Sequence, residues 1–375
     1  MKIEIKKIGF KKLQKRAVWL YDNEINRRDI FDGSVATLTF QGKFIAKAFI
    51  NFNSKIAARV ITFEDEEINK EFWQNRIKTA IKKREDIDSN SYRLIHSEAD
   101  FLPGLIVDRY GDNLVIDITT AGIEKIKDLI VEILIEELNP KGIYQKGDKV
   151  RLKEGLEVVE KTLYGIVDEE FMIIENGKKF LTNLKESQKT GFFLDQRANR
   201  LKLFNLKVDR CLDLFANAGG FGIYSNAKYV KFVEISQLAV EQIHTNAKLN
   251  GLKNYDIVKE DVFKFLETED EKYDLIIVDP PAFAKSKSAK GGALKGWKYL
   301  IVNSLKLLNK GGYIALFSCS HAINSKDLLD LALSSSIIDN SYLEVIEFLK
   351  QDIDHPYLIN IPNSLYLTGI LLRKN

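Results

Sequence analysis

Cysteine is scarce in this sequence, and so are histidine, proline and methionine. The 375 residues include 2 cysteines, 4 histidines, 6 prolines and 2 methionines. The two cysteines, Cys211 and Cys319, exclude a disulfide framework and a cysteine-rich zinc site, and they are typical of a protein from a reducing compartment. The four histidines are scattered along the chain, so the sequence predicts no metal site.

Long apolar runs are also absent. No run approaches the roughly 18 residues that suggest a membrane-spanning helix. Residues 1–7 alternate between apolar and charged side chains and do not form the apolar core of a signal peptide. Hydrophobic residues make up 45% of the chain and charged residues 29%, which is typical of a soluble globular protein. We therefore expect a cytoplasmic protein with no membrane association.

The formal net charge of +3 conceals an uneven distribution of charge. Residues 1–60 carry 13 Lys and Arg residues against 5 Asp and Glu residues. Aromatic residues are interleaved with the basic ones, namely Phe10, Trp19, Tyr21, Phe31, Phe40, Phe44 and Phe49. This composition fits a module that binds the phosphate backbone of a nucleic acid. It fits equally well a small β-domain with an aromatic core and a solvated basic face.

The length predicts two or three domains. Residues 1–66 are rich in short β-type segments and predict a small β-barrel, with strands at 35–40, 44–50 and 58–63. Residues 67–178 predict an α+β domain with a sheet covered on one side. Its expected strands are 92–95, 105–110, 113–119, 142–145 and 171–175, and its helices are 68–83 and a second one that ends before Asn139.

Residues 179–375 predict an α/β domain with a doubly wound, mostly parallel sheet, because strand and helix patterns alternate. The expected parallel strands are 210–215, 229–234, 255–259, 273–278 and 313–318. Segments 342–348 and 365–372 predict an antiparallel pair that closes the sheet. Ligands of such sheets bind beyond the carboxyl ends of the strands.

A glycine-rich turn follows the first expected strand of this α/β domain, and it contains Phe215, Asn217, Gly219 and Gly220. Glycine lets the backbone approach a ligand closely, and the helix after the turn begins with unpaired N–H groups. The turn lacks both the phosphate-loop pattern and the third glycine of the dinucleotide fingerprint. It therefore predicts a nucleotide pocket without identifying the ligand.

Acidic residues stand at the ends of successive strands: Asp213, Glu234, Asp261 and Asp279. Glu234 can accept hydrogen bonds from both hydroxyls of a ribose, and Asp261 can accept from an adenine amine. Asp213 or its neighbouring backbone can hold an amino acid group. A single acid at a strand end often only caps the next helix, but the set favours S-adenosylmethionine over a dinucleotide.

The fourth of these strands ends in Asp279, followed by Pro280 and Pro281. The prolines stiffen the turn and remove N–H groups, which aims carbonyl oxygens and the Asp279 carboxylate at a flat substrate. Phe283 is then placed to stack on a base. The simpler alternative is an ordinary turn between a strand and a loop.

Cys319 follows the fifth parallel strand at the same edge of the sheet, whereas Cys211 lies at the start of a strand and is expected to be a buried apolar side chain. Carbon 5 of a pyrimidine is not nucleophilic until a nucleophile has added to carbon 6. A thiolate is well suited to that addition. Cys319 is therefore a candidate nucleophile, with a second structural cysteine as the alternative.

The whole chain resembles the bacterial large-subunit ribosomal RNA cytosine-5 methyltransferases that carry an N-terminal PUA domain. The resemblance rests on residues 188–197, 212–221, 279–283, 317–320 and 354–356, and on 102–109 and 153–156 in the middle domain. It implies a PUA-like domain at 1–66, a middle domain at 67–178 and a Rossmann-like class I methyltransferase domain with a seven-stranded sheet at 179–375.

The resemblance also implies roles for individual residues. Cys319 matches the nucleophile, Asp279 the carboxylate that holds the cytosine, and Glu234 and Asp261 the ribose and adenine contacts. The segment that flanks the cofactor pocket is matched by Gln188, Thr190, Asp195, Gln196 and Arg197. The family usually has Tyr-Thr-Gly-Gly in the glycine turn, whereas this chain has Asn217 and Ala218 before its two glycines. The missing hydroxyl leaves two alternatives: a weaker contact to the donor's carboxylate, or a replacement of that contact by Ser225 or a backbone N–H.

The sequence therefore predicts an enzyme that uses S-adenosylmethionine to form 5-methylcytidine in 23S ribosomal RNA. Two alternatives stay open: an RNA methyltransferase for an exocyclic amine, adenine N6 or guanine N2, and a non-catalytic protein that binds RNA during ribosome assembly. The expected partner is large-subunit ribosomal RNA. The sequence leaves open whether the chain works as a monomer or as a homodimer.

Overall fold

The computed structural model describes residues 1–184, 192–283, 290–320 and 322–375, and the chain divides into two compact units. Unit 1 comprises Met1–Ile173, Asn183–Leu194 and Ile353–Ser364, and unit 2 comprises Ile174–Thr182, Asp195–Asp352 and Leu365–Asn375. The predicted boundaries at residues 66 and 178 do not coincide with the limits of these units. The division into three domains stays a prediction.

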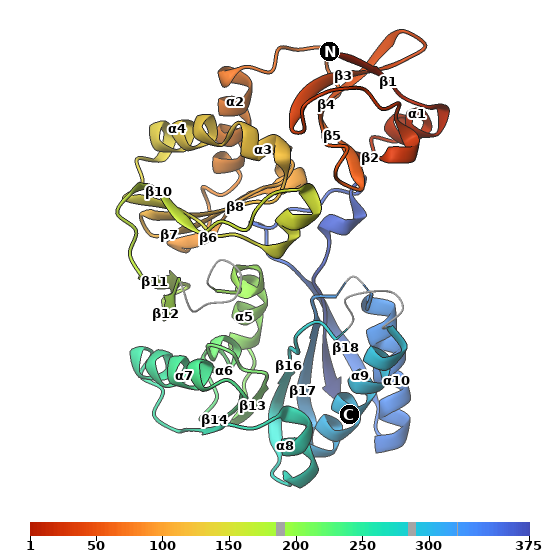
Figure 1. Cartoon of the computed structure of the whole chain (residues 1–375). Coiled ribbons are helices and arrows are strands. Elements are labelled where there is room, and N and C mark those ends of the chain that lie inside the picture. The colour runs from red at the N-terminus through yellow and green to blue at the C-terminus, as the bar shows by residue number, and fades with distance from the viewer. Residues whose placement is uncertain (185–191, 284–289, 321) are drawn as a thin grey trace. The chain divides into compact units, whose positions relative to one another are not determined.

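The first part of unit 1 is a small, strongly curved β-domain (Figure 1). Its five-stranded sheet has the order β1-β3-β4-β5-β2, in which β1 and β3 are parallel and the other neighbours antiparallel. The strands are β1 (Lys2–Glu4), β2 (Trp19–Tyr21), β3 (Ser34–Phe40), β4 (Lys43–Ile50) and β5 (Ile56–Thr62). Gln41 and Gly42 have positive φ and form the tight turn between β3 and β4.

Residues 1–66 also contain a helix, α1 (Lys7–Gln14), where the sequence analysis expected only strands. That expectation is wrong because the helix has only 8 residues, three of them lysines, so its apolar face is narrow. Gly9 and Leu13, four residues apart, are its buried positions. A Cβ atom on Gly9 would lie 2.5 Å from the carbonyl oxygen of Glu24, so glycine allows the helix to pack closely on the β-domain.

The second part of unit 1 is an α+β sheet of the order β10-β9-β8-β7-β6. Its strands are β6 (Ser91–His96), β7 (Leu105–Tyr110), β8 (Asn113–Ile118), β9 (Gly142–Gln145) and β10 (Lys161–Gly165). The helices are α2 (Lys70–Lys82), α3 (Ala121–Lys125) and α4 (Lys127–Leu138). Buried residues of α2 and α4, such as Trp73 and Ile133, form one core with Val107, Ile116 and Ile143 of the sheet. β10 was not predicted from the sequence, because its apolar and polar residues do not alternate regularly and most of them are exposed.

Unit 2 is a doubly wound α/β domain with a seven-stranded sheet of the order β15-β14-β13-β16-β17-β19-β18. The first five strands in this order are parallel, and β19 is antiparallel to both β17 and β18. The strands are β13 (Arg210–Leu214), β14 (Tyr229–Val233), β15 (Tyr255–Val258), β16 (Tyr273–Val278), β17 (Leu308–Ser318), β18 (Leu343–Lys350) and β19 (Thr368–Lys374). This topology confirms the predicted fold class, including the antiparallel pair.

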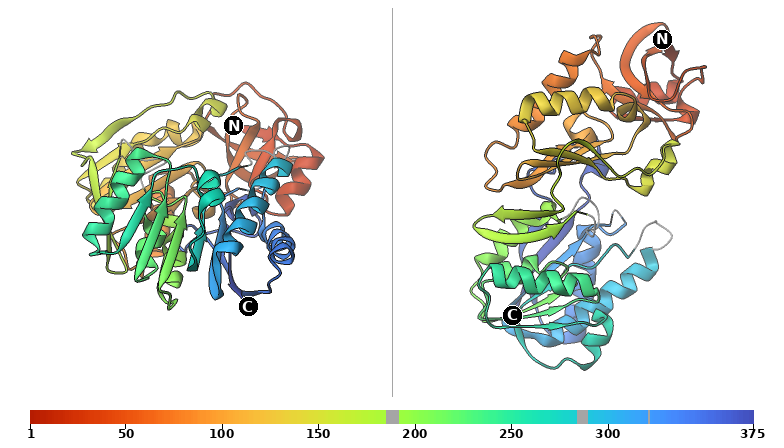
Figure 2. Two further views of the ribbon diagram at one scale, coloured as in Figure 1. Left: turned by 90° about the horizontal axis from the view of Figure 1, so that it is seen from below. Right: turned by 60° about the vertical axis from the view of Figure 1, so that its left-hand side comes forward.

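Helices cover both faces of this sheet (Figures 1 and 2). They are α5 (Arg197–Phe204), α6 (Gly220–Tyr224), α7 (Gln237–Leu249), α8 (Val262–Thr268), α9 (Lys290–Leu307) and α10 (Ser325–Asp339). One core joins α8, α9 and α10 to the sheet through residues such as Phe265, Trp297 and Leu328. Phe221 of α6 stacks on Phe317 of β17 at 4.8 Å between ring centroids, on the other face. Among the described residues no helix is long and apolar enough to cross a membrane.

A β-hairpin of β11 (Glu170–Glu175) and β12 (Lys178–Asn183) is divided between the two units. Its tip belongs to unit 2, where Glu175 forms a buried ion pair with Arg200 of α5, with N–O distances of 2.6 and 2.8 Å. Tyr224 of α6 donates a hydrogen bond to the carbonyl oxygen of Glu175 and stacks on Phe180. The sequence predicts β11 as the strand 171–175, whereas β12 was not predicted.

Candidate active site

The parallel register of β13, β14, β16 and β17 brings the ends of these strands to one edge of the sheet. Leu214 pairs with both Val233 and Val278, and Val278 pairs with Leu316. Phe215, Glu234 and Asp279 each directly follow a residue of this row, and Cys319 follows three residues after Leu316. The structure therefore collects the predicted residues of unit 2 at one edge, where ligands of doubly wound sheets bind.

The glycine-rich turn after β13 has an unusual backbone. Phe215, Asn217 and Gly219 have φ values of 61°, 48° and 78°. Positive φ is uncommon outside glycine, and for a bulky aromatic residue such as Phe215 it is an outlier that proteins retain mainly at functional sites. The turn leads directly into α6, whose first residue is Gly220. The strained backbone supports the prediction of a binding site at this turn.

Asp213 holds the turn in place. It is 1% exposed, and its Oδ2 accepts a hydrogen bond of 2.8 Å from the N–H of Gly222 in α6. Burial raises the pKa of the Asp213 carboxyl well above its usual value, and the negative charges of Asp279 and Glu234 raise it further. The Asp213 carboxylate is thus directed at α6, and a contact of Asp213 or its neighbouring backbone with a ligand stays a prediction.

Glu234 is positioned by backbone donors from two segments. Its Oε2 accepts a hydrogen bond from the N–H of Asn217, and its Oε1 accepts from the N–H groups of Ile235 and Ser236, all at 2.9 Å. A carboxylate has about four lone-pair positions, so three such bonds orient Glu234 and retain acceptor capacity on Oε2. This arrangement suits a side chain that accepts a further hydrogen bond from a sugar hydroxyl.

Asp261 is the N-cap of α8, the simpler role that the sequence analysis set beside the adenine contact. Its Oδ1 accepts from the N–H groups of Phe263 and Lys264 at 2.9 and 3.3 Å.

Ile235 was not predicted from the sequence as a site residue. It directly follows Glu234 and is 63% exposed at this edge. The signal for Ile235 was a large apolar residue immediately after an acidic strand end, where a flat ring needs an apolar surface.

The turn after β16 places a half-buried Asp279, a buried Pro280 and an exposed Pro281 at the same edge. Phe283 packs in an aromatic cluster, with ring centroids 6.4 Å from Phe215, 6.0 Å from Phe263 and 6.2 Å from Trp297. Its ring therefore supports the inner wall of the site. Stacking of Phe283 on a base stays a prediction.

The two cysteines have the different environments that the sequence predicts. Cys211 is fully buried in β13, and burial raises the pKa of its thiol well above the usual value. Cys319 follows β17 and is partly accessible. Reactive cysteines lie in partly exposed surroundings, whereas buried ones are inert. Of the two thiols, only that of Cys319 lies at the carboxyl edge of the sheet.

The segment before α5 contributes two of the predicted residues. Gln196 is 3% exposed, and its Nε2 donates a 3.1 Å hydrogen bond to Oδ2 of Asp279. Arg197 is 6% exposed and forms a 2.7 Å ion pair with Asp352. Gln188 and Thr190, which were predicted to flank the cofactor pocket, lie outside the described residues.

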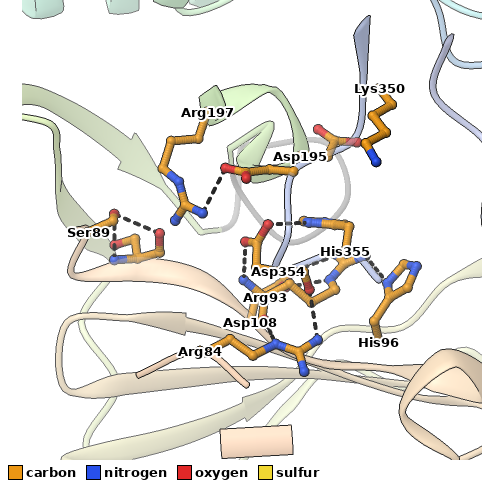
Figure 3. A network of polar contacts seen from close by, with 12 residues as sticks. Arg84, Ser89, Arg93, His96, Asp108, Asp195, Arg197, Lys350, Asp354 and His355 are labelled. Atoms are coloured by element: carbon orange, nitrogen blue, oxygen red, sulfur yellow. Dashed lines mark hydrogen bonds and ion pairs between the residues drawn. The ribbon is translucent and has the colours of Figure 1, made fainter. Parts of the chain in front are cut away.

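Residues 354–356, part of the motif set, lie in the segment 353–364, which belongs to unit 1. Asp354 is fully buried there, and its Oδ2 accepts from the N–H of Arg93 at 2.9 Å while its Oδ1 lies 2.9 Å from Nδ1 of His355 (Figure 3). Burial lowers the pKa of nearby His96, which is therefore neutral at pH 7. These residues anchor the β18–β19 connection within unit 1.

The basic residues of the N-terminal domain are largely solvent-exposed, whereas most of its aromatic residues are packed in its core. Two aromatic residues are exposed, Tyr21 at 43% and Phe31 at 85%. Phe31 follows Arg27 and Arg28, and the guanidinium of Arg27 lies 5.5 Å from the ring centroid of Phe52. An exposed aromatic ring beside arginines is a pattern that stacks on nucleic acid bases and contacts phosphates.

The groups at the sheet edge fit S-adenosylmethionine. Glu234 provides an oriented carboxylate, Ile235 an exposed apolar surface, and Gly219 a backbone with positive φ at the start of α6. No group of three or more metal-ligating side chains occurs among residues 1–184, 192–283, 290–320 and 322–375. The site is therefore built from acceptors, backbone N–H groups and apolar surface.

Two protein-family models match the chain. Residues 3–63 match a PUA-like domain, and residues 155–358 match an S-adenosylmethionine-dependent methyltransferase. The "Ribosomal RNA large subunit methyltransferase I" of Aeromonas hydrophila is 36% identical over 383 residues, covering 97% of this chain and 96% of that protein. The protein with the same name from Vibrio cholerae is 35% identical over 388 residues, covering 96% of each.

The fold is also present in solved structures. A structure described as a SAM-dependent methyltransferase from Streptococcus mutans matches with a TM-score of 0.84 and 22% identity, over 100% of both chains. Another, described as a methyltransferase complexed with SAH, has a TM-score of 0.85 and 22% identity over 100% of both chains. At this level of identity the likeness establishes a shared fold, and both units are included in it.

Proposed function

Because the chain belongs to the S-adenosylmethionine-dependent methyltransferase family that includes the ribosomal RNA large subunit methyltransferase I proteins, we propose that it methylates carbon 5 of a cytidine in 23S ribosomal RNA. The observation that carries the proposal is that Cys319 and Asp279 directly follow the adjacent strands β17 and β16, beyond the pair Val278–Leu316. A cysteine is required for carbon 5 chemistry and has no role in methylation of an amine. The substrate places the enzyme in the cytoplasm.

The cofactor site in this proposal consists of residues from three strand ends. Glu234 accepts from the ribose hydroxyls, Oδ2 of Asp261 from the adenine amine, and Ile235 contacts the adenine ring. The backbone at Phe215, Asn217, Gly219 and Gly220, held by Asp213, surrounds the amino acid group. S-adenosylmethionine, when bound, supplies an electrophilic methyl group at carbon 5.

The chain's own residues prepare the base in this mechanism. The Cys319 thiolate adds to carbon 6, forming an S–C bond and shifting the C5–C6 π electrons to carbon 5, which thereby becomes nucleophilic. Asp279 holds the base at N3 and its exocyclic amine, where it stabilises the charge and the proton that the addition requires. Pro280 and Pro281 fix the direction of that carboxylate. After methylation, loss of the C5 proton to a base restores the double bond and expels the thiolate.

Replacement of Cys319 by alanine tests the nucleophile. The variant is expected to lose methylation of 23S ribosomal RNA, whereas Cys211→Ala, which removes the other thiol, is expected to keep it. RNA that contains 5-fluorocytidine is expected to form a covalent adduct with the wild type, because fluorine at carbon 5 cannot leave as a proton. Full methylation by Cys319→Ala would contradict the proposal and favour the amine methyltransferase, whose Asp-Pro-Pro turn would be the same.

Binding of S-adenosylmethionine, measured by calorimetry, separates both enzymes from a non-catalytic RNA-binding protein. If millimolar S-adenosylmethionine gives no heat of binding, only the non-catalytic alternative remains.

The N-terminal domain is proposed to bind the RNA backbone, with Arg27, Arg28 and Phe31 on its exposed loop. RNA affinity should then fall steeply with salt, because phosphate contacts release counterions. A flat salt response would exclude this domain from RNA binding.

A further inference from the structure

Gln196 contacts Asp279 through an amide whose orientation is determined by its neighbours. Its Nε2 donates to Oδ2 of Asp279 at 3.1 Å, and its Oε1 accepts from Nδ2 of Asn199 at 2.7 Å. Asn199 is only 1% exposed, and the same Nδ2 also donates to the carbonyl oxygen of Lys350 at 3.1 Å. A carbonyl oxygen can only accept, so Lys350 orients the amide of Asn199, and Asn199 in turn orients that of Gln196.

The segment that carries both amides is fixed to the C-terminal strands of unit 2. The N–H of Asp352 donates to the carbonyl oxygen of Asp195 at 3.0 Å, and the hydroxyl of Tyr366 donates to Oδ2 of Asp195 at 2.7 Å. Arg197 pairs with Asp352 at 2.7 Å. The start of α5 is thus held by contacts to residues after β18 and before β19, so Gln196 has little freedom to move away from Asp279.

We propose that Gln196 is a positioning residue for Asp279 and that Asn199 acts on Asp279 through Gln196. Each N–H that a carboxylate accepts restricts its rotation and favours its ionised form. Gln196 therefore sets the direction and the proton affinity of the group that holds the substrate base. The resemblance implied only that Gln196 flanks the cofactor pocket. The inference rests on the proposed function, because it assigns Asp279 to the substrate.

The test compares Gln196→Ala, Gln196→Glu and Asn199→Ala with Asn205→Ala. Asn205 is an exposed asparagine at the end of the same helix, whose Nδ2 donates only a 3.3 Å bond to Leu201, so it is the matched control. The measurements are the affinity for S-adenosylmethionine by calorimetry, and kcat for 23S ribosomal RNA at saturating S-adenosylmethionine as a function of pH. Gln196→Glu retains the acceptor for Asn199 and therefore preserves the local fold.

We expect Gln196→Ala and Asn199→Ala to bind S-adenosylmethionine as the wild type does, with kcat reduced about 10- to 100-fold, the value of one hydrogen bond to a charged group. The limb of the pH profile that Asp279 governs should move to higher pH in Gln196→Ala. It should move further in Gln196→Glu, because two adjacent carboxylates disfavour ionisation. Asn205→Ala should match the wild type in all measurements.

Unchanged kcat and pH profile in the Gln196 variants would overturn the inference while the wild type continues to methylate RNA. A loss of activity explained entirely by weaker S-adenosylmethionine binding would also overturn it, since Gln196 would then be a cofactor residue. A wild type that binds S-adenosylmethionine but methylates no cytidine would instead refute the proposed function. The two failures are therefore distinguishable.

Discussion

Asp354→Ala is expected to destabilise unit 1 and to release the connection between β18 and β19. The Asp354 carboxylate is fully buried and accepts a hydrogen bond from the backbone N–H of Arg93. The backbone carbonyl oxygen of Asp354 accepts a second hydrogen bond, of 2.8 Å, from Nη2 of Arg84. Alanine keeps the backbone contact to Arg84 but leaves the Arg93 donor and the His355 ring without this carboxylate. Both arginines are also paired with other carboxylates, Arg84 with Asp100 and Arg93 with Asp108.

The magnitude follows from these contacts. A buried donor left without its acceptor costs about 1–3 kcal/mol, and the loss of one member of a buried charged network costs about 3–5 kcal/mol. We expect a decrease of about 3–4 kcal/mol in the free energy of unfolding of unit 1. At roughly 2–4 °C per kcal/mol for a unit of this size, the midpoint of thermal unfolding should fall by about 10 °C. Asp354→Asn retains an acceptor for Arg93 and should lose less.

Hydrogen exchange followed by mass spectrometry is the appropriate assay, because it reports on each segment separately. Peptides that cover residues 353–364 should lose protection in Asp354→Ala, whereas peptides from β13 and β14 should keep theirs. Asn363→Ala changes an exposed residue of the same connection and is the matched control. Unchanged exchange of 353–364 together with an unchanged unfolding midpoint would refute the reasoning that this carboxylate anchors the connection.

Other substitutions test the electrostatics and packing of both units. Burial raises the pKa of Asp117 to about 7, above its unfolded value of 3.8, so unit 1 loses stability as pH rises from about 4 through 7. Asp117→Asn should remove this dependence and stabilise unit 1 by roughly 1–3 kcal/mol in urea unfolding at pH 8. Glu175→Ala should cost unit 2 about 3–5 kcal/mol in urea unfolding, because it removes the carboxylate that pairs with the buried guanidinium of Arg200. Gly222→Ala should cost about 1–3 kcal/mol, because its Cβ would lie 2.3 Å from Cε1 of Phe232. Equal unfolding midpoints for variant and wild type would contradict each expectation.

Much of the α/β domain could be predicted from the sequence, because its parallel strands are continuous apolar segments bounded by turns. The expected strand at 273–278 has the bounds of β16, and that at 229–234 exceeds β14 by one residue. Segments with a weak apolar period were missed, such as β12, whose burial depends on contacts with α6 and α7 made by residues far along the chain. Sequence periodicity shows only which face of a single helix or strand is apolar, and it does not show burial that depends on distant segments.

The sequence by itself determined the class of the site. Acids stand at successive strand ends, a glycine turn at Gly219 follows one strand, and Cys319 follows another. Parallel strands bring all of these residues to the same edge of the sheet. The sequence also determined the separation of the two cysteines into a buried one and an accessible one. Only the tertiary structure decided which groups restrain which. It directs Asp213 to the N–H of Gly222, Gln196 to Asp279 and Asp354 to Arg93. Hydrogen bonds between residues that are 9, 83 and 261 positions apart depend on chain packing, which no local pattern specifies.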